Sequence, residues 1–222
     1  TPAPQQAASV EEAANTINAG GNKATLILAN GKKISLTDAR VGYIASQSGS
    51  HVLKTKDGLL VYTADGQQLK SSTIGYNTIE TPNGGQYQVD LPDGTRVWLN
   101  AASKLKYPAR FTGNKREVAL SGEGYFEVAK DPSRPFTVST IKQHIEVLGT
   151  HFNINSYDDE KYVKTTLLEG SVKVTRPDND QGAVRQLILR PGEQSVVGDD
   201  VMKMDKVEAE NFIAWKNGNF IF

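Results

Sequence analysis

Two glutamates and a tyrosine on one predicted strand are the side chains best spaced for catalysis. Glu123, Tyr125 and Glu127 alternate along GEGYFEV, so their side chains lie on the same face of that strand. A pair of carboxylates can perform glycoside hydrolysis when one acid protonates the leaving group and the other attacks or activates water. Acids on the outward face of an antiparallel strand are far more often solvated than catalytic. We therefore expect that the chain is not an enzyme, and we assign no catalytic residue.

Residues that bind metals or act as nucleophiles do not cluster in this sequence. His51, His144 and His151 are scattered and form neither H-x-H nor H-E-x-x-H, the spacings that bring two histidines onto one metal ion. The chain has no cysteine, which excludes disulfides, thiolate metal sites and cysteine nucleophiles. No glycine pair is followed by the lysine and hydroxyl residue of a phosphate-binding loop. We expect neither a metal site nor a bound cofactor.

The charges of the chain are balanced, which narrows the class of partner. The 222 residues include 25 basic and 25 acidic ones, with no block of like charge. Nucleic acid is not an expected partner, because binding to phosphates needs a basic stripe. No apolar run reaches the roughly 18 residues that a membrane helix requires, and no signal-peptide pattern is visible. Since the sequence begins with Thr1 rather than Met, we expect it to be a piece of a longer protein.

The strands that carry these residues can be predicted from the residue types of the turns between them. In VDLPDGTRVWL, the loop 92–94 combines proline, aspartate and glycine, which suit the successive positions of a bulged three-residue hairpin turn. This turn pairs Val89 with Val97 and Tyr87 with Leu99. The apolar side chains then share one face of the hairpin. The segment is therefore predicted to be a half-buried β-hairpin.

The same turn recurs at residues 29–31, 56–58 and 64–66. In each turn the glycine occupies the left-handed position, so we expect positive φ angles at Gly31, Gly58, Gly66 and Gly94. Between residues 23 and 200 no segment has a convincing helical period. Short strands broken by glycine and proline are typical of all-β folds. We predict a mainly β fold, either an antiparallel jelly roll or sandwich or a β-solenoid-like stack of hairpins.

Short helices are expected only near the two ends of the chain, and they mark the predicted limits of the β domain. Residues 1–22 should form a disordered lead-in and a short helix that begins with a capping box, and residues 23–204 one β domain. In residues 205–222 a second capping box, Asp205 to Glu208, should begin another helix. We expect KNGNFIF, the last seven residues, to begin a strand that is cut off before an absent C-terminal domain.

Four residues are candidates for binding a partner, namely Arg96, Trp98, Phe220 and Phe222. Trp98 lies on the face opposite Val97, with Arg96 two residues before it. Tryptophan and arginine are enriched at interaction hot spots, but Trp98 has a second interpretation, in which it covers another packing surface of the domain. Phe220 and Phe222 belong to the predicted cut strand, which an absent domain would bury.

Beyond these local rules, much of the chain resembles a known family. The runs LPDGTRVWLNAASKLKYP, GEGYFEVAKDPSRPFTV, VLGTHFNI, TTLLEGSVKV and LRPGEQSVV occur in order. Together they resemble FecR-family proteins of the Bacteroidetes type, which are transmembrane sigma-factor regulators. The resemblance covers about residues 74–222 and, less distinctively, residues 23–66. It implies the periplasmic domain of such a regulator, with no catalytic residues to carry over.

The resemblance also implies a compartment and partners. The family senses the signalling domain of a TonB-dependent outer-membrane transporter and controls an extracytoplasmic-function sigma factor. We expect the domain to be periplasmic, with the sigma factor bound by an absent cytoplasmic segment and the inner membrane crossed by an absent helix. The alternative is a carbohydrate-binding β-sandwich, in which Trp98, Tyr125 and Tyr157 stack on sugars. The inducing substrate, iron chelate or glycan, is not encoded in any pattern of the sequence.

Overall fold

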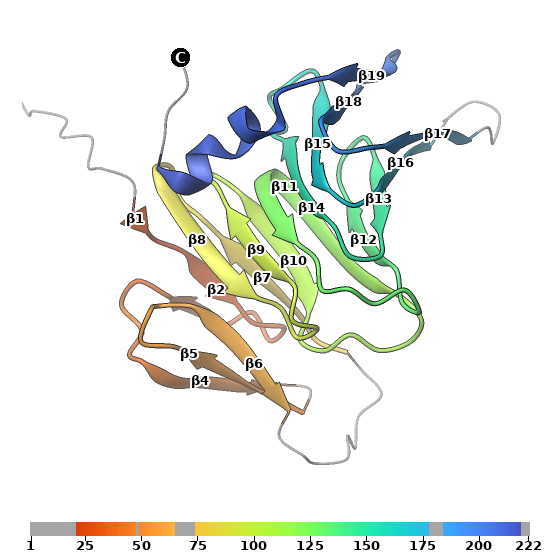
Figure 1. Cartoon of the computed structure of the whole chain (residues 1–222). Helices are drawn as coiled ribbons and strands as arrows, with labels where there is room; N and C mark the ends of the chain where they lie inside the picture. The colour runs from red at the N-terminus through yellow and green to blue at the C-terminus, as the bar shows by residue number, and fades with distance from the viewer. Residues whose placement is uncertain (1–20, 48, 65–73, 178–183, 219–222) are drawn as a thin grey trace, which may run out of the picture.

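The computed structural model describes residues 21–47, 49–64, 74–177 and 184–218. Two sets of hydrogen-bonded strands contain almost all of the regular secondary structure in this part of the chain (Figure 1). The first sheet contains, in spatial order, β3 (Lys33–Ser35), β2 (Thr25–Ile27), β7 (Tyr76–Glu80), β10 (Lys104–Pro108), the start of β11 (Arg116–Glu127), β12 (Phe136–Ser139), β13 (His144–Val147), β16 (Val172–Pro177) and β17 (Val184–Leu189).

The second sheet shares β11 with the first, and its strands are again given in spatial order. It contains β4 (Gly42–Gln47), β5 (Ser50–Lys54), β6 (Leu60–Ala64), β8 (Gly85–Asp90), β9 (Arg96–Leu99), the end of β11, β14 (His151–Ser156), β15 (Val163–Glu169), β18 (Glu193–Val197) and β19 (Met202–Lys206). A two-residue strand, β1 (Gly21–Asn22), pairs with β8. The chain alternates between the two sheets, usually after one or two strands.

Strand β11 passes from one sheet to the other at a single residue. Residues 116–121 pair with β10 and β12 in the first sheet, whereas residues 122–127 pair with β9 and β14 in the second. Gly122, the first residue of the second half, has a φ of 90°. Such a left-handed backbone favours glycine, and glycine in a strand commonly marks a bend. Gly122 thus provides the bend that links the two sheets.

The two sheets pack face to face around one apolar core. The buried cluster takes side chains from both sheets, including Leu105 and Ile145 from the first and Val97 and Phe152 from the second. Phe126 at the end of β11 stacks on Phe152 at a centroid distance of 5.1 Å with an interplanar angle of 7°. A strand period of two brings alternate residues into this core, and the resulting sandwich confirms the predicted fold class.

The predicted hairpin turns are also confirmed where the structure describes them. Val89 pairs with Val97 and Tyr87 with Leu99, as the turn chemistry requires. The φ angles of Gly31, Gly58 and Gly94 are 81°, 83° and 85°. The fourth predicted turn, with Gly66, lies outside the described residues. One difference is that both sheets are mixed, since β12 runs parallel to the start of β11 in the first and β6 runs parallel to β8 in the second. The chain returns from the end of β11 to the first sheet before it begins β12, and such a crossover makes a pair parallel.

The predicted capping box near the C-terminus is wrong. Asp205 lies inside β19, where its carboxylate accepts a bond of 2.6 Å from Lys203 Nζ. The helix that follows, η1 (Ala209–Asn217), is a 3₁₀ helix, and the side chain at its N-cap position, Glu208, makes no capping bond. Pairing with β18 through Lys206 overrides the local capping signal. The predicted final strand is corrected as well, because η1 includes its first two residues.

The remaining end segments are not open to comparison. The predicted N-terminal lead-in and helix, apart from the last two residues of the range 1–22, lie outside the described residues, and so do Phe220 and Phe222. Within the part of the chain that the structure describes, no helix is long and apolar enough to cross a membrane.

Candidate partner-binding surface

The outer face of the second sheet carries a continuous row of polar and aromatic side chains. Cross-strand pairing aligns one residue from each of six neighbouring strands, in the order Gln88, Trp98, Tyr125, Asn153, Thr166 and Gln194. The inner face of the same strands is apolar and belongs to the core. A sheet with an apolar inner face and a polar outer face normally has the outer one in water. In this sheet, however, the side chains of the row from Tyr125 to Gln194 are buried.

Two of the four predicted partner-binding residues lie on this outer face. Trp98 and Arg96 are two residues apart on β9, so their side chains point the same way. The Trp98 ring lies 5.6 Å from the ring of Tyr125, its cross-strand neighbour on β11. Arg96 Nη2 lies 3.5 Å from Glu127 Oε2. The other two candidates, Phe220 and Phe222, fall outside the described residues.

Helix η1 covers part of this face (Figure 1). Lys216 Nζ lies 4.0 Å from the centroid of the Trp98 ring and 4.3 Å from that of Tyr125. The same ammonium group lies 3.2 Å from Glu127 Oε1. Gln86 Nε2 donates a hydrogen bond of 3.4 Å to the carbonyl of Trp215. In this arrangement Trp98 contributes to a second packing surface, as one interpretation of the sequence holds, and its role in binding a partner stays a prediction.

The carboxylate of Glu123 is held inside a polar network on this face rather than solvated. Asn100 Nδ2 donates a hydrogen bond of 2.7 Å to Glu123 Oε2, and Asn153 Nδ2 donates one of 2.9 Å to Oε1. Burial raises the pKa of Glu123 above its usual value, although both amide donors favour the ionised form. The expectation of a solvated acid was therefore wrong. Asn153 belongs to β14 and Asn100 directly follows β9, so sequence spacing alone did not show them.

A buried ion pair is the feature that sequence reasoning missed most clearly. Arg116 Nη1 lies 2.8 Å from Asp93 Oδ2, and the two side chains are only 1% and 4% exposed. Arg116 also donates hydrogen bonds to the carbonyls of Arg134 and Ala129, each of 2.8 Å. This pair fixes the 92–94 turn to the start of β11 and to the loop that follows it. The sequence did contain a sign of this pair. The alternation in REVAL places Arg116 on the same inward face as Val118, so a buried arginine that needs a partner could have been predicted.

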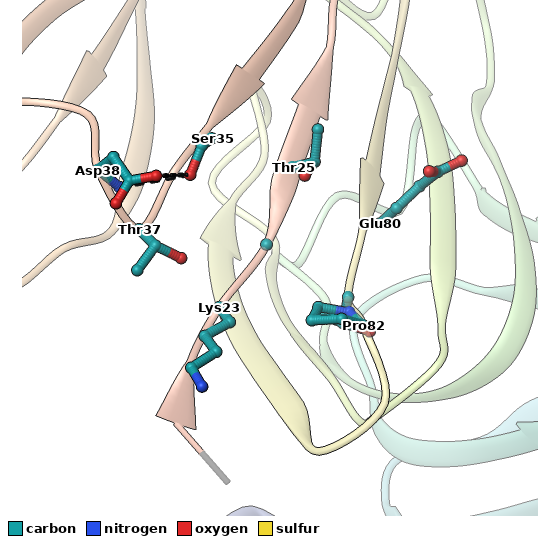
Figure 2. Close-up of a pocket in the computed structure, with 9 residues that line it drawn as sticks. Lys23, Thr25, Ser35, Thr37, Asp38, Glu80 and Pro82 are labelled. Carbon is teal, nitrogen blue, oxygen red and sulfur yellow. Dashed lines mark hydrogen bonds between the residues drawn. The ribbon is translucent and has the colours of Figure 1, made fainter. Parts of the chain in front are cut away.

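A shallow hollow of 420 Å³ opens on the first sheet beside β2 (Figure 2). Several of its polar groups already have partners within the chain. Ser35 Oγ donates a hydrogen bond of 2.6 Å to Asp38 Oδ2 on one side, and Glu80 on the other side lies 2.7 Å from Lys104 Nζ. Among the described residues, no three potential metal ligands gather at one place. The hollow therefore presents no set of metal ligands in this part of the chain.

One outer strand, β4, carries no charged side chain, although a bulge lies between Tyr43 and Ala45. Within the described residues this strand, with the segment GYIASQ, pairs only with β5. Tyr43 is 64% exposed, and Val41, just before the strand, is 57% exposed. The other outer strands, β3, β17 and β19, each carry lysine or arginine, which proteins commonly use to prevent strand pairing at an edge. The β4 edge is accordingly the one best suited to accept a strand from another protein.

Comparison with known proteins identifies the family. The model of the family described as FecR protein matches residues 77–173. A crystal structure at 2.50 Å resolution of a Parabacteroides distasonis protein assigned as an anti-sigma factor is 33% identical, with a TM-score of 0.61 over 66% of this chain and 67% of that one. A second structure with the same description, at 1.65 Å, is also 33% identical, with a TM-score of 0.60 over 65% and 66%. No curated protein matches the chain.

The matched region contains the parts of the molecule described above. It runs from β7 into β16 and includes the Asp93–Arg116 pair, Trp98, Glu123 and the sheet change at Gly122. The chain spans about two thirds of the length of the two solved structures that it matches. At 33% identity over this length, both the fold and the family are established. The chain therefore belongs to the FecR family.

Proposed function

We propose that this chain is the periplasmic sensing part of a sigma-factor regulator. Membership of the FecR family, with an anti-sigma factor as a structural neighbour, carries this proposal. These relationships support a role in signalling and imply interaction with a sigma factor. In the proposal the sigma factor binds a segment outside this sequence, and a membrane helix outside it tethers the domain to the inner membrane.

The signal that the domain receives is proposed to come from a protein. The signalling domain of a TonB-dependent transporter would reach across the periplasm and contact the β sandwich, which would relay the contact toward the membrane. A rigid sandwich with one shared core suits a relay, because movement of one strand is transmitted through close packing rather than absorbed by it. The balanced charge of the chain favours a neutral protein surface over a strongly charged partner.

The β4 edge is the docking position that we propose. An added strand forms main-chain hydrogen bonds with an open edge, and exposed side chains beside the edge provide specificity. Tyr43 and Val41 are the exposed apolar side chains here. No charged group within β4 opposes the pairing. An extended, uncharged segment of the transporter domain would therefore complete the second sheet.

We also propose that the domain acts without catalysis. Both carboxylate oxygens of Glu123 accept hydrogen bonds from asparagine side chains, and Glu127 is engaged by Arg96 and Lys216. Because these carboxylate oxygens are occupied by groups of the chain, neither acid is free to contact a substrate. Replacement of Glu123 by glutamine is the check, since loss of a measured turnover in that variant would contradict this part of the proposal.

The alternative role, a carbohydrate-binding module, has one observation in its favour. Trp98 and Tyr125, two of the three aromatic residues named for this role, are adjacent on one sheet face. Lys216 lies over both rings, however, and occupies the position that a sugar would need. Tyr157 donates its hydroxyl hydrogen to the carbonyl of Ala101. A glycan that bound and shifted the Trp98 indole signal in the intact chain would favour this role.

The proposed docking can be tested with purified proteins. The periplasmic signalling domains of the TonB-dependent transporters of the same organism are titrated, one at a time, against the chain. We expect saturable binding of one domain, weakened at least tenfold by Tyr43→Lys, since a charge would then lie beside the added strand. Tyr76→Lys is the matched control, because Tyr76 is 48% exposed on β7, in the other sheet. If no domain binds, the proposed partner is wrong; if both variants bind equally, the proposed edge is wrong.

A further inference from the structure

Three side chains on the outer face of the second sheet form a cage around one ammonium group. The rings of Trp98 and Tyr125 are tilted by 55° with centroids 5.6 Å apart. The ammonium of Lys216 lies within 4.3 Å of both centroids and 3.2 Å from Glu127 Oε1. Aromatic faces attract cations through their quadrupole, and a carboxylate supplies the opposite charge. This is the chemistry of a receptor for a basic side chain.

The ammonium group in the cage comes from a distant part of the same chain. The cage residues belong to β9 and β11, whereas Lys216 belongs to the last turn of η1, 89 residues after Glu127. The side chains of Lys216 and Glu127 are each only 18% exposed. The contact therefore holds the C-terminal helix to the central strands of the sandwich.

In the described part of the chain, the other attachments of η1 are few, and they include the long hydrogen bond from Gln86 to the carbonyl of Trp215. The helix is of the 3₁₀ type, with poorer hydrogen-bond geometry than an α-helix. Its N-cap residue makes no side-chain bond, and only Ile213 and Ala214 are buried. The indole N–H of Trp215 is buried without a hydrogen-bond partner in the described part of the chain. A buried unpaired donor disfavours the docked position, so retention of η1 depends strongly on Lys216.

The charges around Glu127 also limit how strongly it holds Lys216. Glu127 is shared between Lys216 and Arg96, whose guanidinium lies 3.5 Å from the second carboxylate oxygen. Arg96 already compensates part of the charge of Glu127, which reduces the attraction for Lys216. Because both side chains remain 18% exposed, salt screens this contact in part. A competing lysine or arginine side chain would therefore meet a site of moderate, not irreversible, affinity.

We propose that Trp98, Tyr125 and Glu127 form a binding site for a basic side chain, which Lys216 fills as an internal ligand so that η1 is held as a releasable latch. This inference rests on the contacts of the chain itself and does not depend on the proposed transporter partner. Release of Lys216 would expose the faces of both aromatic rings and free η1 from the sheet. The residue class that can open the latch is lysine or arginine supplied by a partner protein.

The latch is tested by two variants of residue 216, one that removes the positive charge and one that keeps it. Lys216→Met keeps an unbranched, largely apolar side chain without the ammonium, and Lys216→Arg keeps a cation. By amide hydrogen exchange on the full chain, we expect Lys216→Met to speed exchange of η1 about tenfold, with the core strands unchanged. Lys216→Arg should stay close to the parent. Equal exchange of η1 in the parent and in Lys216→Met would overturn the latch.

The binding site is tested separately with a small probe. The chain has two tryptophans, so its two indole N–H signals in an NMR spectrum can be assigned to Trp98 and Trp215 by substitution. In Lys216→Ala, n-butylammonium should shift the Trp98 signal saturably, whereas neutral 1-butanol should not. In the parent chain, where Lys216 fills the cage, the same probe should have little effect. No shift in Lys216→Ala, or an equal shift with 1-butanol, would overturn the assignment of a cation site.

Discussion

At the scale of residues, polar side chains stabilise this sandwich mainly by joining segments that are distant in sequence. Arg116 and Asp93 connect the start of β11 to the 92–94 turn, and Thr95 Oγ1 adds a bond of 2.7 Å to the same carboxylate. A buried charge without its partner is very costly, whereas an intact pair contributes little more than an apolar pair of the same shape. The main contribution of this ion pair is therefore to fix the position of the 92–94 turn against β11, rather than to add net stability.

The first residue-scale prediction concerns this ion pair. Asp93→Asn should lower the free energy of unfolding by roughly 3–5 kcal/mol, because it leaves the Arg116 charge buried. Arg116→Met should have a similar effect, and the double variant should be much less unstable than the sum of the two. Urea unfolding of all four proteins gives the coupling energy. Additive effects would show that the pair does not act as a unit.

The second residue-scale prediction concerns the pH dependence of stability. Burial raises the pKa of Glu123 in the folded chain above its unfolded value. The folded state is thus favoured while the group is protonated, and stability falls as the pH rises through the folded pKa. Glu123→Gln should remove this fall, so the variant gains stability relative to the parent between acidic and neutral pH. Glu117→Gln, at an exposed position of β11, is the control, and a difference independent of pH would contradict the prediction.

At the scale of elements, the fold depends on the bend of β11. The prediction is that Gly122→Ala destabilises the chain by about 3 kcal/mol, against about 1 kcal/mol for Gly31→Ala. Both glycines have positive φ, so both substitutions strain the backbone. A Cβ at Gly122 would also lie 2.7 Å from the Cα of Ser103, whereas one at Gly31 meets nothing within 4 Å. Thermal or urea unfolding measures the difference, and equal costs would mean that the sheet change does not need this close approach.

The elements also show what the sequence predicts well and what it does not. The 92–94 hairpin was predicted with its register because a turn and alternate residues are local properties. The bonds that join Glu123 to Asn100 and Asn153 span 23 and 30 residues. Their formation depends on which strands become neighbours, and no local spacing encodes that. The Asp205 capping box failed for the same reason, since pairing of β19 with β18 overrode a correct local signal.

At the scale of the whole molecule, the family was predicted more securely than the site. Ordered motifs over much of the chain resembled FecR proteins, and the family model and the solved structures confirm this. The candidate Trp98 was chosen for its residue type, but its neighbours Tyr125 and Lys216 come from other elements. Neither the partner-binding role of Trp98 nor that of Phe220 and Phe222 follows from the family alone.

The central claim is that this domain relays a periplasmic signal to sigma-factor control. The most direct measurement is sigma-dependent transcription in cells with the parent regulator intact, with residues 21–218 deleted, or with them replaced by an unrelated β-sandwich of similar size. We predict that the response to the transporter's inducer is present in the intact regulator and lost in both others, at equal protein levels. A response to inducer that survives the replacement would show that the domain is only a spacer, and would contradict the account.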